Sequence, residues 1–530
     1  MGVIDLTTFK GEIPKLSAKL LPEGNADTAL NCGLESGNLK PMAGVTTGIE
    51  PMAEDIQTIH KRGAEFLAFA GIVNVARSFV SASNRLIYTG SGYPKEYDGS
   101  SHIRLGIAAP TNALTIHLTG TPVEGDTIRS VSYVYTRVSK RSDGSDVESA
   151  PSAPTGVTDI YSSQSVAVSG FTTSGMPTGT AVSHYRLYRL TSGLAGAEYQ
   201  FVKEITTSEG VGEVSDAVPD SDLGEVLPTT EWTAPPETLS GLVATSHGMM
   251  YGFVGNRIYP SEVFIPYAYP EAYAMTVESD IVAIGYTGSM VVVLTKTVPY
   301  LLYGQSPENL ELKRLGHAQP CVSARSVVNV PGGVIYAAPD GLFMVNESGQ
   351  GSLLTKDLFT REQWAAKTPA NAIGFYFDES YLCFFNGTND GFQINLETGI
   401  YSVYETSQNI YGGMYSPEDD KLYLIQTDGA AREVVSWRTG AGISYSWKSK
   451  IFSFPYYMAM TAGMVQGSFG SLSITLYVDG VAQDPVTVSS DDVFRFSPVL
   501  GQEFQVLLNG TSHVDRVKIG QSAAEVMNVQ

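Results

Sequence analysis

The chain has 530 residues, and its 33 Lys and Arg against 54 Asp and Glu give a formal net charge of −21. This acidity argues against a nonspecific nucleic-acid binder, because such binding relies on Lys and Arg to neutralise phosphates. At ~150 residues per domain, the length indicates three or four domains or one large repeat array.

The composition favours strands over helices. The sequence contains 54 Gly and 29 Tyr, and Gly, Asn, Asp and Ser separate its short apolar runs. We therefore predict a mainly β protein, in which a β-propeller carries an inserted fibronectin type III-like β-sandwich and is followed by a C-terminal β-sandwich. The apolar runs fall short of the ~18 residues that a membrane span needs, so we expect a soluble protein.

Residues 1–45 are predicted to form an extended docking arm. Gly and Pro recur through weakly periodic sequence, at Gly11, Pro14, Pro22, Gly37 and Pro41. Such a segment either docks on another surface or supplies a strand that closes the propeller, and both options stay open. The start of the chain has no basic region, no apolar stretch and no Ser or Thr at position 6, so we expect neither a secretory nor a myristoylation signal.

Residues 46–109 are predicted to supply the first propeller strands. We expect a short helix from Ala53 to Lys61, and a hairpin from Arg85 to Tyr97 that turns around Gly90-Ser91-Gly92. Pro94 and Lys95 occupy the positions where a phosphate-binding loop would open its helix, so this turn is not a phosphate cradle.

Residues 110–230 are predicted to form a domain inserted into the propeller. The runs Val131 to Val138 and His184 to Leu190 alternate between two faces, as strands of a two-sheet sandwich do. The stretch from Ser142 to Pro154 between them is rich in turn residues. We therefore expect a fibronectin type III-like module of ~100 residues.

Residues 231–440 are predicted to contain the remaining blades, with hairpins recurring every ~40–50 residues. The hairpins are Met249 to Tyr259 with a turn at Gly255-Asn256, Val282 to Thr295 with a turn at Gly288, Val334 to Val345 with a turn at Pro339-Asp340-Gly341, Tyr381 to Ile394 with a turn at Asn386 to Gly391, and Leu422 to Val434 with a turn at Asp428-Gly429. No single hairpin can bury its apolar face alone, so the array predicts a propeller split by the insertion. A second helix is expected from Thr360, where Thr360 and Gln363 form a capping box.

Residues 441–530 are predicted to form a C-terminal β-sandwich. Its expected strands are Ser471 to Val478, Val486 to Ser489, Phe494 to Phe496, Glu503 to Leu508 and Val514 to Ile519.

The sequence indicates no catalytic residue, no cofactor-binding residue, no metal ligand and no cofactor. Cys32, Cys321 and Cys383 lack paired spacing, so neither disulfides nor a zinc knuckle is expected, and Cys321 is predicted to be a buried thiol rather than a nucleophile. The histidines show no pair at metal-binding spacing on a predicted helix. They are His60, His102, His117, His184, His247, His317 and His513.

One segment imitates a calcium loop. Asn386 to Glu397 places oxygen side chains at the first, third, fifth and twelfth loop positions, with Gly at the sixth. However, Asn replaces Asp at the first position, Ile394 occupies the ninth, and both flanks resemble strands. A hairpin turn is therefore favoured, and calcium binding is left open.

Two other features are of the kind found in proteins that act on glycans. Glycosidases use pairs of carboxylates, and the sequence contains two adjacent pairs, Asp419-Asp420 and Asp491-Asp492. The side chains of adjacent residues on a turn point apart, so we favour solvated turns for both pairs. The aromatic clusters Phe264 to Pro270 and Phe454 to Tyr457 fit a glycan or protein contact surface. We favour an interface or core for them.

Several runs resemble a family of tailed-phage virion proteins. They are Leu223 to Thr229, Trp232 to Leu239, Tyr251 to Tyr259, Val293 to Thr295 with Pro299-Tyr300, Gln319 to Ser323 and Val334 to Leu342. The arm from Leu21-Pro22 to Pro41 agrees with the same pattern, so the resemblance covers most of residues 20–400. The ordered series is similar to the tail nozzle, or hub (tail tubular), proteins of short-tailed bacteriophages.

The resemblance implies a structural protein without catalysis. Members of that family form a ring, six-fold in symmetry, below the portal and adaptor, and the ring continues the DNA channel and takes part in genome ejection. The implied partners are further copies of the chain, portal and adaptor proteins, tail fibres or appendages, and double-stranded DNA that passes without sequence-specific binding. The implied location is the virion tail, after synthesis in the bacterial host cytoplasm, with no membrane insertion. The surface that faces the lumen, a distal gate and the orientation of the insert stay open.

Two alternatives remain. A propeller that binds or hydrolyses host-surface glycans would need carboxylates or aromatic residues at one mouth of the propeller. A host-encoded adhesion protein with a fibronectin module would need a secretory signal, which the sequence start does not resemble.

Overall fold

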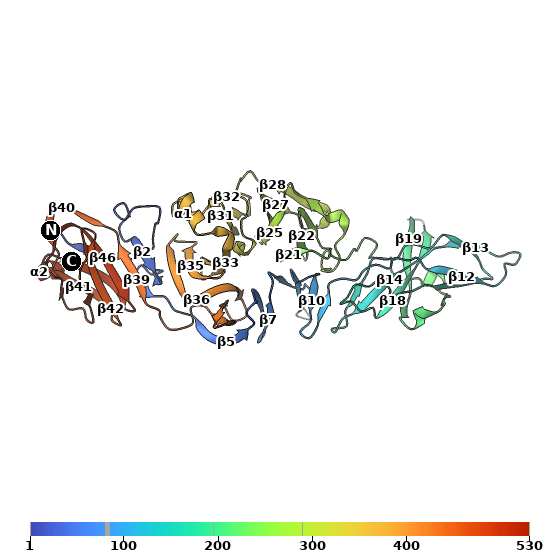
Figure 1. Ribbon diagram of the computed structural model, residues 1–530. Helices are drawn as coiled ribbons and strands as arrows, with labels where there is room; N and C mark the ends of the chain where they lie inside the picture. Colours follow the sequence, from blue (N-terminus) through green and yellow to red (C-terminus); the bar gives the residue numbers. More distant parts are fainter. Residues whose placement is uncertain (1, 80–84, 194–195, 289, 529–530) are drawn as a thin grey trace.

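The computed structural model describes residues 2–79, 85–193, 196–288 and 290–528. The chain is 50% strand and 6% helix, which confirms the mainly β prediction. The molecule is elongated: a central group of sheets lies between the C-terminal strands at one end and the strands of residues 115–216 at the other (Figure 1).

Four central sheets each consist of four antiparallel strands that follow one another along the chain. The first contains β8 (Asn74–Arg77), β9 (Leu86–Thr89), β10 (Lys95–Tyr97) and β11 (His102–Arg104). The second contains β21 (Ser240–Ala244), β22 (Met250–Val254), β23 (Arg257–Pro260) and β24 (Met275–Thr276). The third contains β25 (Ile281–Tyr286), β26 (Val291–Thr295), β27 (Pro299–Tyr303) and β28 (Glu311–Arg314). The fourth contains β29 (Val328–Val330), β30 (Gly333–Ala338), β31 (Gly341–Asn346) and β32 (Gly351–Leu353).

Two more four-stranded units belong to a larger sheet and share its longest strand, β36 (Tyr401–Ser416). One unit adds β33 (Ala372–Phe377), β34 (Ser380–Phe385) and β35 (Thr388–Asn395) to the first half of β36. The other adds β37 (Lys421–Asp428), β38 (Ala431–Ser436) and the early strand β5 (Thr46–Met52) to its second half. The first strands of consecutive units contact one another from β8 through β21, β25, β29 and β33 to β36.

All six predicted hairpins are present, one in each of these six units. The turn after Gly288 includes Ser289, which lies outside the described residues. The turn predicted for Asn386 to Gly391 is wrong in length, because β35 already begins at Thr388 and leaves only Asn386-Gly387 between the strands.

The helix predicted from Ala53 to Lys61 is wrong. This segment contains β6 (Thr58–Arg62), which pairs with β7 (Glu65–Phe69) and lies beside β36. The spacing of Ile56 and Ile59 imitates one helix face, but both side chains pack in a core with Tyr423 and Val434. A short helix is marginal by itself, so the cross-strand hydrogen bonds and this packing decide the outcome.

The helix predicted at Thr360 is confirmed as α1 (Arg361–Ala366). The Thr360 side chain accepts a hydrogen bond from the Gln363 amide, and the Gln363 side chain accepts one from the Thr360 amide, which completes the capping box. The described residues also contain the short 3-10 helices η2 (Glu209–Val211), η3 (Asp220–Asp222), η4 (Glu271–Tyr273), η5 (Pro307–Asn309), η6 (Ala324–Ser326) and η7 (Pro369–Asn371).

The described strands of residues 115–216 form three sheets, and all three contribute residues to one apolar core. One sheet has the order β12 (Thr115–Thr119), β17 (Ser165–Ser169) and β20 (Val214–Asp216), and another pairs β13 (Ile128–Val131) with β16 (Thr158–Tyr161). The largest has the order β15 (Asp146–Glu148), β14 (Tyr133–Lys140), β18 (His184–Gly193) and β19 (Gly196–Thr206). The predicted alternation of side chains between two faces is present in β14, because Tyr133 and Tyr135 lie in the shared core whereas Val134 packs on the opposite face with Tyr188 and Leu227. Both faces of β14 are buried.

The C-terminal strands form two facing layers around a large core. They are β39 (Tyr445–Ser449), β40 (Phe452–Ala459), β41 (Ala462–Ser468), β42 (Leu472–Val478), β43 (Val481–Ala482), β44 (Val486–Thr487), β45 (Phe494–Arg495), β46 (Leu500–Gly510) and β47 (His513–Gly520), followed by the helix α2 (Ala523–Asn528). Each of the five strands predicted here is present.

The N-terminal arm lies against these same strands. It contains β1 (Ile4–Leu6), β2 (Ala26–Leu30), β3 (Cys32–Gly33) and β4 (Lys40–Pro41). Strand β1 pairs with β47, and β2 pairs with both β39 and β36, so the arm joins the C-terminal strands to the central sheets. The two ends of the chain therefore lie at the same end of the molecule (Figure 1). The arm docks on its own chain, and the strand that completes a central unit is β5, directly after it.

Candidate functional site

The three cysteines are free and buried. Burial raises the pKa of each thiol, that of Cys321 to about 12, which makes the thiolate scarce at neutral pH. The prediction that Cys321 is a buried thiol is confirmed.

The two acidic pairs lie in different surroundings, and the carboxylates of Asp419 and Asp420 bind separate partners. Asp419 binds the Lys61 ammonium at 2.8 Å, while Asp420 accepts a hydrogen bond from Tyr415 at 2.8 Å. Burial alone would raise the pKa of Asp419, but its hydrogen bonds to Lys61 and Tyr423 hold that pKa below its usual range. Both members of the other pair, Asp491 and Asp492, are exposed.

The segment that imitates a calcium loop does not form one. Residues 388–395 belong to β35, so its oxygen side chains are spread along an extended strand instead of surrounding a point. The Asn386 side-chain oxygen accepts a hydrogen bond from Arg325 at 3.2 Å, and the Asn389 amide donates to Glu405 at 2.9 Å.

The two aromatic clusters differ in burial. In the first, Tyr269 is 1% exposed and belongs to a core, whereas Phe264 is exposed. In the second, Tyr456 and Tyr457 are exposed on β40, where four residues of β40 bulge opposite Gln502. The first cluster is therefore mostly core, and the second leaves aromatic rings on the surface.

A cavity of about 350 Å³ lies among the first strands of the central units. It is lined by segments beside β6, β8, β21, β25, β29, β33 and β36. Among its lining residues in the described part of the chain, Arg325 is the one charged side chain. Those lining residues therefore place no pair of carboxylates at this cavity.

Arg325 forms hydrogen bonds with three separate segments of the chain at the wall of the cavity. Its guanidinium donates to the Gln57 carbonyl at 3.0 Å, to the Tyr411 carbonyl at 2.5 Å and to Asn386. Burial lowers the pKa of Arg325 to about 10. Glycine at position 412 allows the Gln57 carbonyl to lie this close to β36, because a Cβ at position 412 would lie 2.2 Å from the Gln57 carbonyl oxygen.

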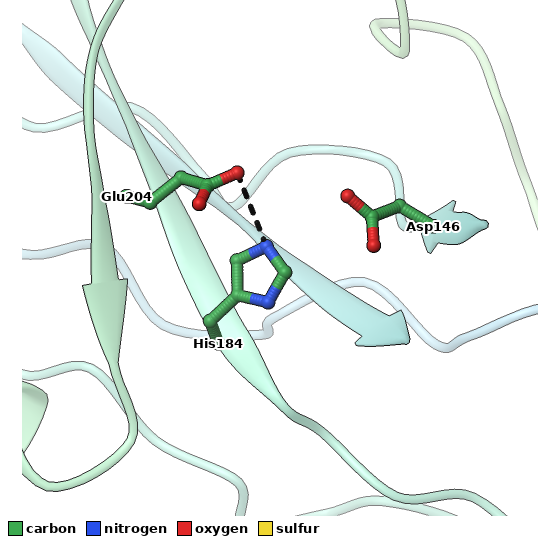
Figure 2. Close-up of side chains that lie close together, drawn as sticks. All are labelled: Asp146, His184 and Glu204. Atoms are coloured by element: carbon green, nitrogen blue, oxygen red, sulfur yellow. Dashed lines mark ion pairs between the residues drawn. The ribbon is translucent and has the colours of Figure 1, made fainter. Parts of the chain in front are cut away.

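The structure brings together one group of metal-ligating side chains that the sequence did not reveal. Asp146 of β15, His184 of β18 and Glu204 of β19 place ligand atoms within 4.8 Å of one another. Figure 2 shows the imidazole between the two carboxylates, with a dashed line from His184 Nε2 to Glu204 Oε1 at 3.4 Å, a contact that is an ion pair only when the imidazole is protonated. We call these three residues the Asp-His-Glu cluster.

Arg186 lies beside the Asp-His-Glu cluster and binds three carboxylates. Its guanidinium is 2.6 Å from Asp146 Oδ2, 2.7 Å from Glu148 Oε2 and 3.2 Å from Glu204 Oε1. Burial alone would lower the pKa of Arg186, but hydrogen bonds and charge from Glu148 and Glu204 raise it, so the side chain stays charged. Three carboxylates and one guanidinium leave an excess of two negative charges here.

No local signal marks these residues, because they come from different strands. His184 is opposite Val138 of β14 and Thr206 of β19, and Arg186 is opposite Glu204. The register of the sheet, rather than spacing along the chain, creates the cluster. An open groove of about 420 Å³ adjoins it and is lined by Glu148, Arg186, Glu204 and the nearby Phe201.

No known protein-family model matches this sequence, and comparison with curated proteins finds no match either. Solved structures show only distant similarity. The crystal structure of Chaetomium thermophilum Raptor is 8% identical with a TM-score of 0.31, and the match covers 76% of this chain and 29% of that one. The AfRom2 CNH domain is 11% identical with a TM-score of 0.26 (60% and 93% covered). The dihydro-heme d1 dehydrogenase NirN is 11% identical with a TM-score of 0.28 (58% and 72% covered).

The chain spans less than a third of the length of the Raptor chain that it matches. Similarities at this level do not assign a family. Within the described ranges, none of the helices has the length and apolar character needed to cross a bilayer.

Proposed function

We propose that this chain is a structural component of a bacteriophage tail, a nozzle subunit that assembles with its own copies into a ring below the portal and adaptor. In this role the chain has no catalytic activity. The ring continues the DNA channel and takes part in genome ejection, and the protein resides in the tail of the virion.

The observation that carries the proposal is the ordered series of runs that resembles nozzle proteins. Tyr251 to Tyr259 is the β22–β23 hairpin, Val293 to Thr295 ends β26, and Val334 to Leu342 spans the β30–β31 turn. The runs thus fall in consecutive central sheets, and the last two lie largely in buried strands. A series that follows the repeat of the fold supports a resemblance over the whole central region rather than at one motif.

We infer that the central units form a β-propeller. Three features support this: six four-stranded antiparallel units follow one another, their first strands contact in sequence, and one cavity is lined by a segment from each. Strand β5 completes the last unit from the N-terminal side, and the β6–β7 hairpin lies between that unit and β8. Under the same proposal, residues 110–230 are a fibronectin type III-like insert and residues 441–530 a C-terminal β-sandwich.

The charge of the chain is consistent with a DNA conduit. Each Lys or Arg contact to phosphate adds to the retention of DNA, whereas an acidic or neutral lumen lets DNA pass. The net charge of −21 provides the excess of carboxylates over Lys and Arg from which such a lumen can be built.

Quantitative peptide mass spectrometry of purified virions tests the proposal. Copies of this chain are compared with the portal subunit, and an abundant host cytoplasmic protein serves as the control for carry-over. A six-fold ring below a twelve-fold portal predicts half as many copies of this chain as of the portal subunit. Absence from washed particles, or a level no higher than that of the host control, refutes the proposal and directs attention to a glycan-binding or glycan-hydrolysing protein.

A further inference from the structure

We propose that Asp146, His184 and Glu204 bind a divalent transition-metal ion, of which Zn²⁺ is the type suited to this donor set. One imidazole nitrogen and two carboxylates are ligands that Zn²⁺ takes in proteins, and a solvent molecule completes the coordination. The site is on the face of the β15-β14-β18-β19 sheet, and it is independent of the tail function proposed above.

The hydrogen bonds of His184 leave a lone pair at Nε2. The Ser183 hydroxyl donates its hydrogen to the Val138 carbonyl at 2.9 Å, so it accepts from His184 Nδ1 at 2.9 Å. In the neutral form of the imidazole, these bonds place the proton on Nδ1 and leave Nε2 as the nitrogen that faces the carboxylates. This arrangement, in which the second ring nitrogen donates to an oxygen, is the one that metal-binding histidines use.

Two buried atoms of the cluster have no hydrogen-bond partner among the residues that the structure describes. They are His184 Nε2 and Asp146 Oδ1, while Asp146 Oδ2 is bound by Arg186. When the imidazole is neutral, its Nε2 lone pair lies beside carboxylate oxygens, and a cation held between Nε2 and Oδ1 offsets their repulsion. The excess of two negative charges around Arg186 matches the charge of one divalent ion.

Arg186 serves as an outer partner of this site. It holds one oxygen of Asp146 and one of Glu204, which fixes the orientation of both carboxylates. The side chain of Glu204 is 55% exposed, so the ion has a path from solvent. The imidazole ligand favours Zn²⁺ over Mg²⁺ and Ca²⁺, which prefer sites built from oxygen atoms alone.

The insert offers a matched control. His117 also forms an ion pair with a glutamate, Glu213, at 3.6 Å, and its other ring nitrogen is bonded to the Ser169 hydroxyl at 2.7 Å. This pair belongs to no cluster with a second carboxylate among the described residues. H117Q therefore removes a comparable side chain without removing a proposed ligand.

Zn²⁺ binding to the full chain is measured by isothermal titration calorimetry after chelation, in excess Mg²⁺, with Co²⁺ absorption as a second readout. We expect about one Zn²⁺ per chain for the unmodified protein and H117Q, and affinity at least ~10-fold weaker for both H184Q and E204Q. Unfolding without metal checks that the variants fold, and E204Q alters a side chain that is 55% exposed. No Zn²⁺ binding by the unmodified chain, or equal affinity in H184Q and H117Q, overturns the proposal.

Discussion

Replacing Phe9 by alanine tests whether the N-terminal arm is part of the C-terminal core. The Phe9 side chain is fully buried, and its ring meets the buried Trp447 ring edge-on with centroids 5.0 Å apart. Truncation of a buried Phe to Ala costs about 3–5 kcal/mol, through lost apolar transfer and the cavity that remains. The surroundings here are paired strands on both sides, which limits collapse into the cavity, so we expect a loss of about 4 kcal/mol in the free energy of unfolding.

Urea unfolding of the full chain, followed by tryptophan fluorescence, measures this loss, and hydrogen exchange locates it. Protection should fall in β1, β39 and β47, because these strands contribute to the core in which Phe9 is buried. Leu20→Ala is the matched control, since Leu20 lies in the same arm but is 71% exposed. It should change stability by less than about 0.5 kcal/mol. A loss below about 1 kcal/mol for Phe9→Ala, or equal losses for both variants, would refute the reasoning and indicate an arm that is free to dock elsewhere.

Three further changes probe single interactions. Burial raises the pKa of Glu12 to about 7, so the folded state binds its proton more tightly than a free carboxyl with a pKa of 4.5 does. The free energy of unfolding therefore falls as pH rises between these two values and then levels off. Glu12→Gln should remove roughly 3 kcal/mol of this pH dependence in urea unfolding at pH 5 and pH 8, and an unchanged pH dependence would contradict the burial argument. Glu96→Gln removes the buried carboxylate that pairs with Arg85 and Arg141, and should cost about 3 kcal/mol in the same assay, whereas a loss under about 1 kcal/mol would mean that the two arginines find other partners. Thr360→Ala removes the cap of α1 and should cost about 1 kcal/mol, seen as faster hydrogen exchange in its first turn; unchanged exchange there would show that packing alone holds the helix.

Local patterns were sufficient to predict the hairpins and the capped helix. At Gly255, for example, φ is +57°, a conformation that glycine adopts without strain, and the turn there joins β22 to β23 as expected. The capping box at Thr360 is likewise complete within four residues. Such features depend on neighbours in the sequence, so the sequence carries their signal.

Long-range pairing overrode the local pattern elsewhere. Ile56 and Ile59 have helical spacing, yet the second belongs to a strand, because β7 and β36 supply hydrogen bonds and apolar contacts that a short isolated helix lacks. Similarly, the weakly periodic arm becomes β1 and β2 only beside β47 and β39, which are at the other end of the chain.

The sequence by itself therefore determined the strand-rich class, the turns and the cap, because each is a property of a few adjacent residues. The tertiary structure alone decided where the arm docks and which polar side chains meet. His184 and Glu204 are brought to Asp146 by the register of β14, β15, β18 and β19, and hydrogen bonds between separate strands set that register. The Asp-His-Glu cluster thus has no counterpart in the spacing of the sequence, since its physical cause is strand pairing across the sheet.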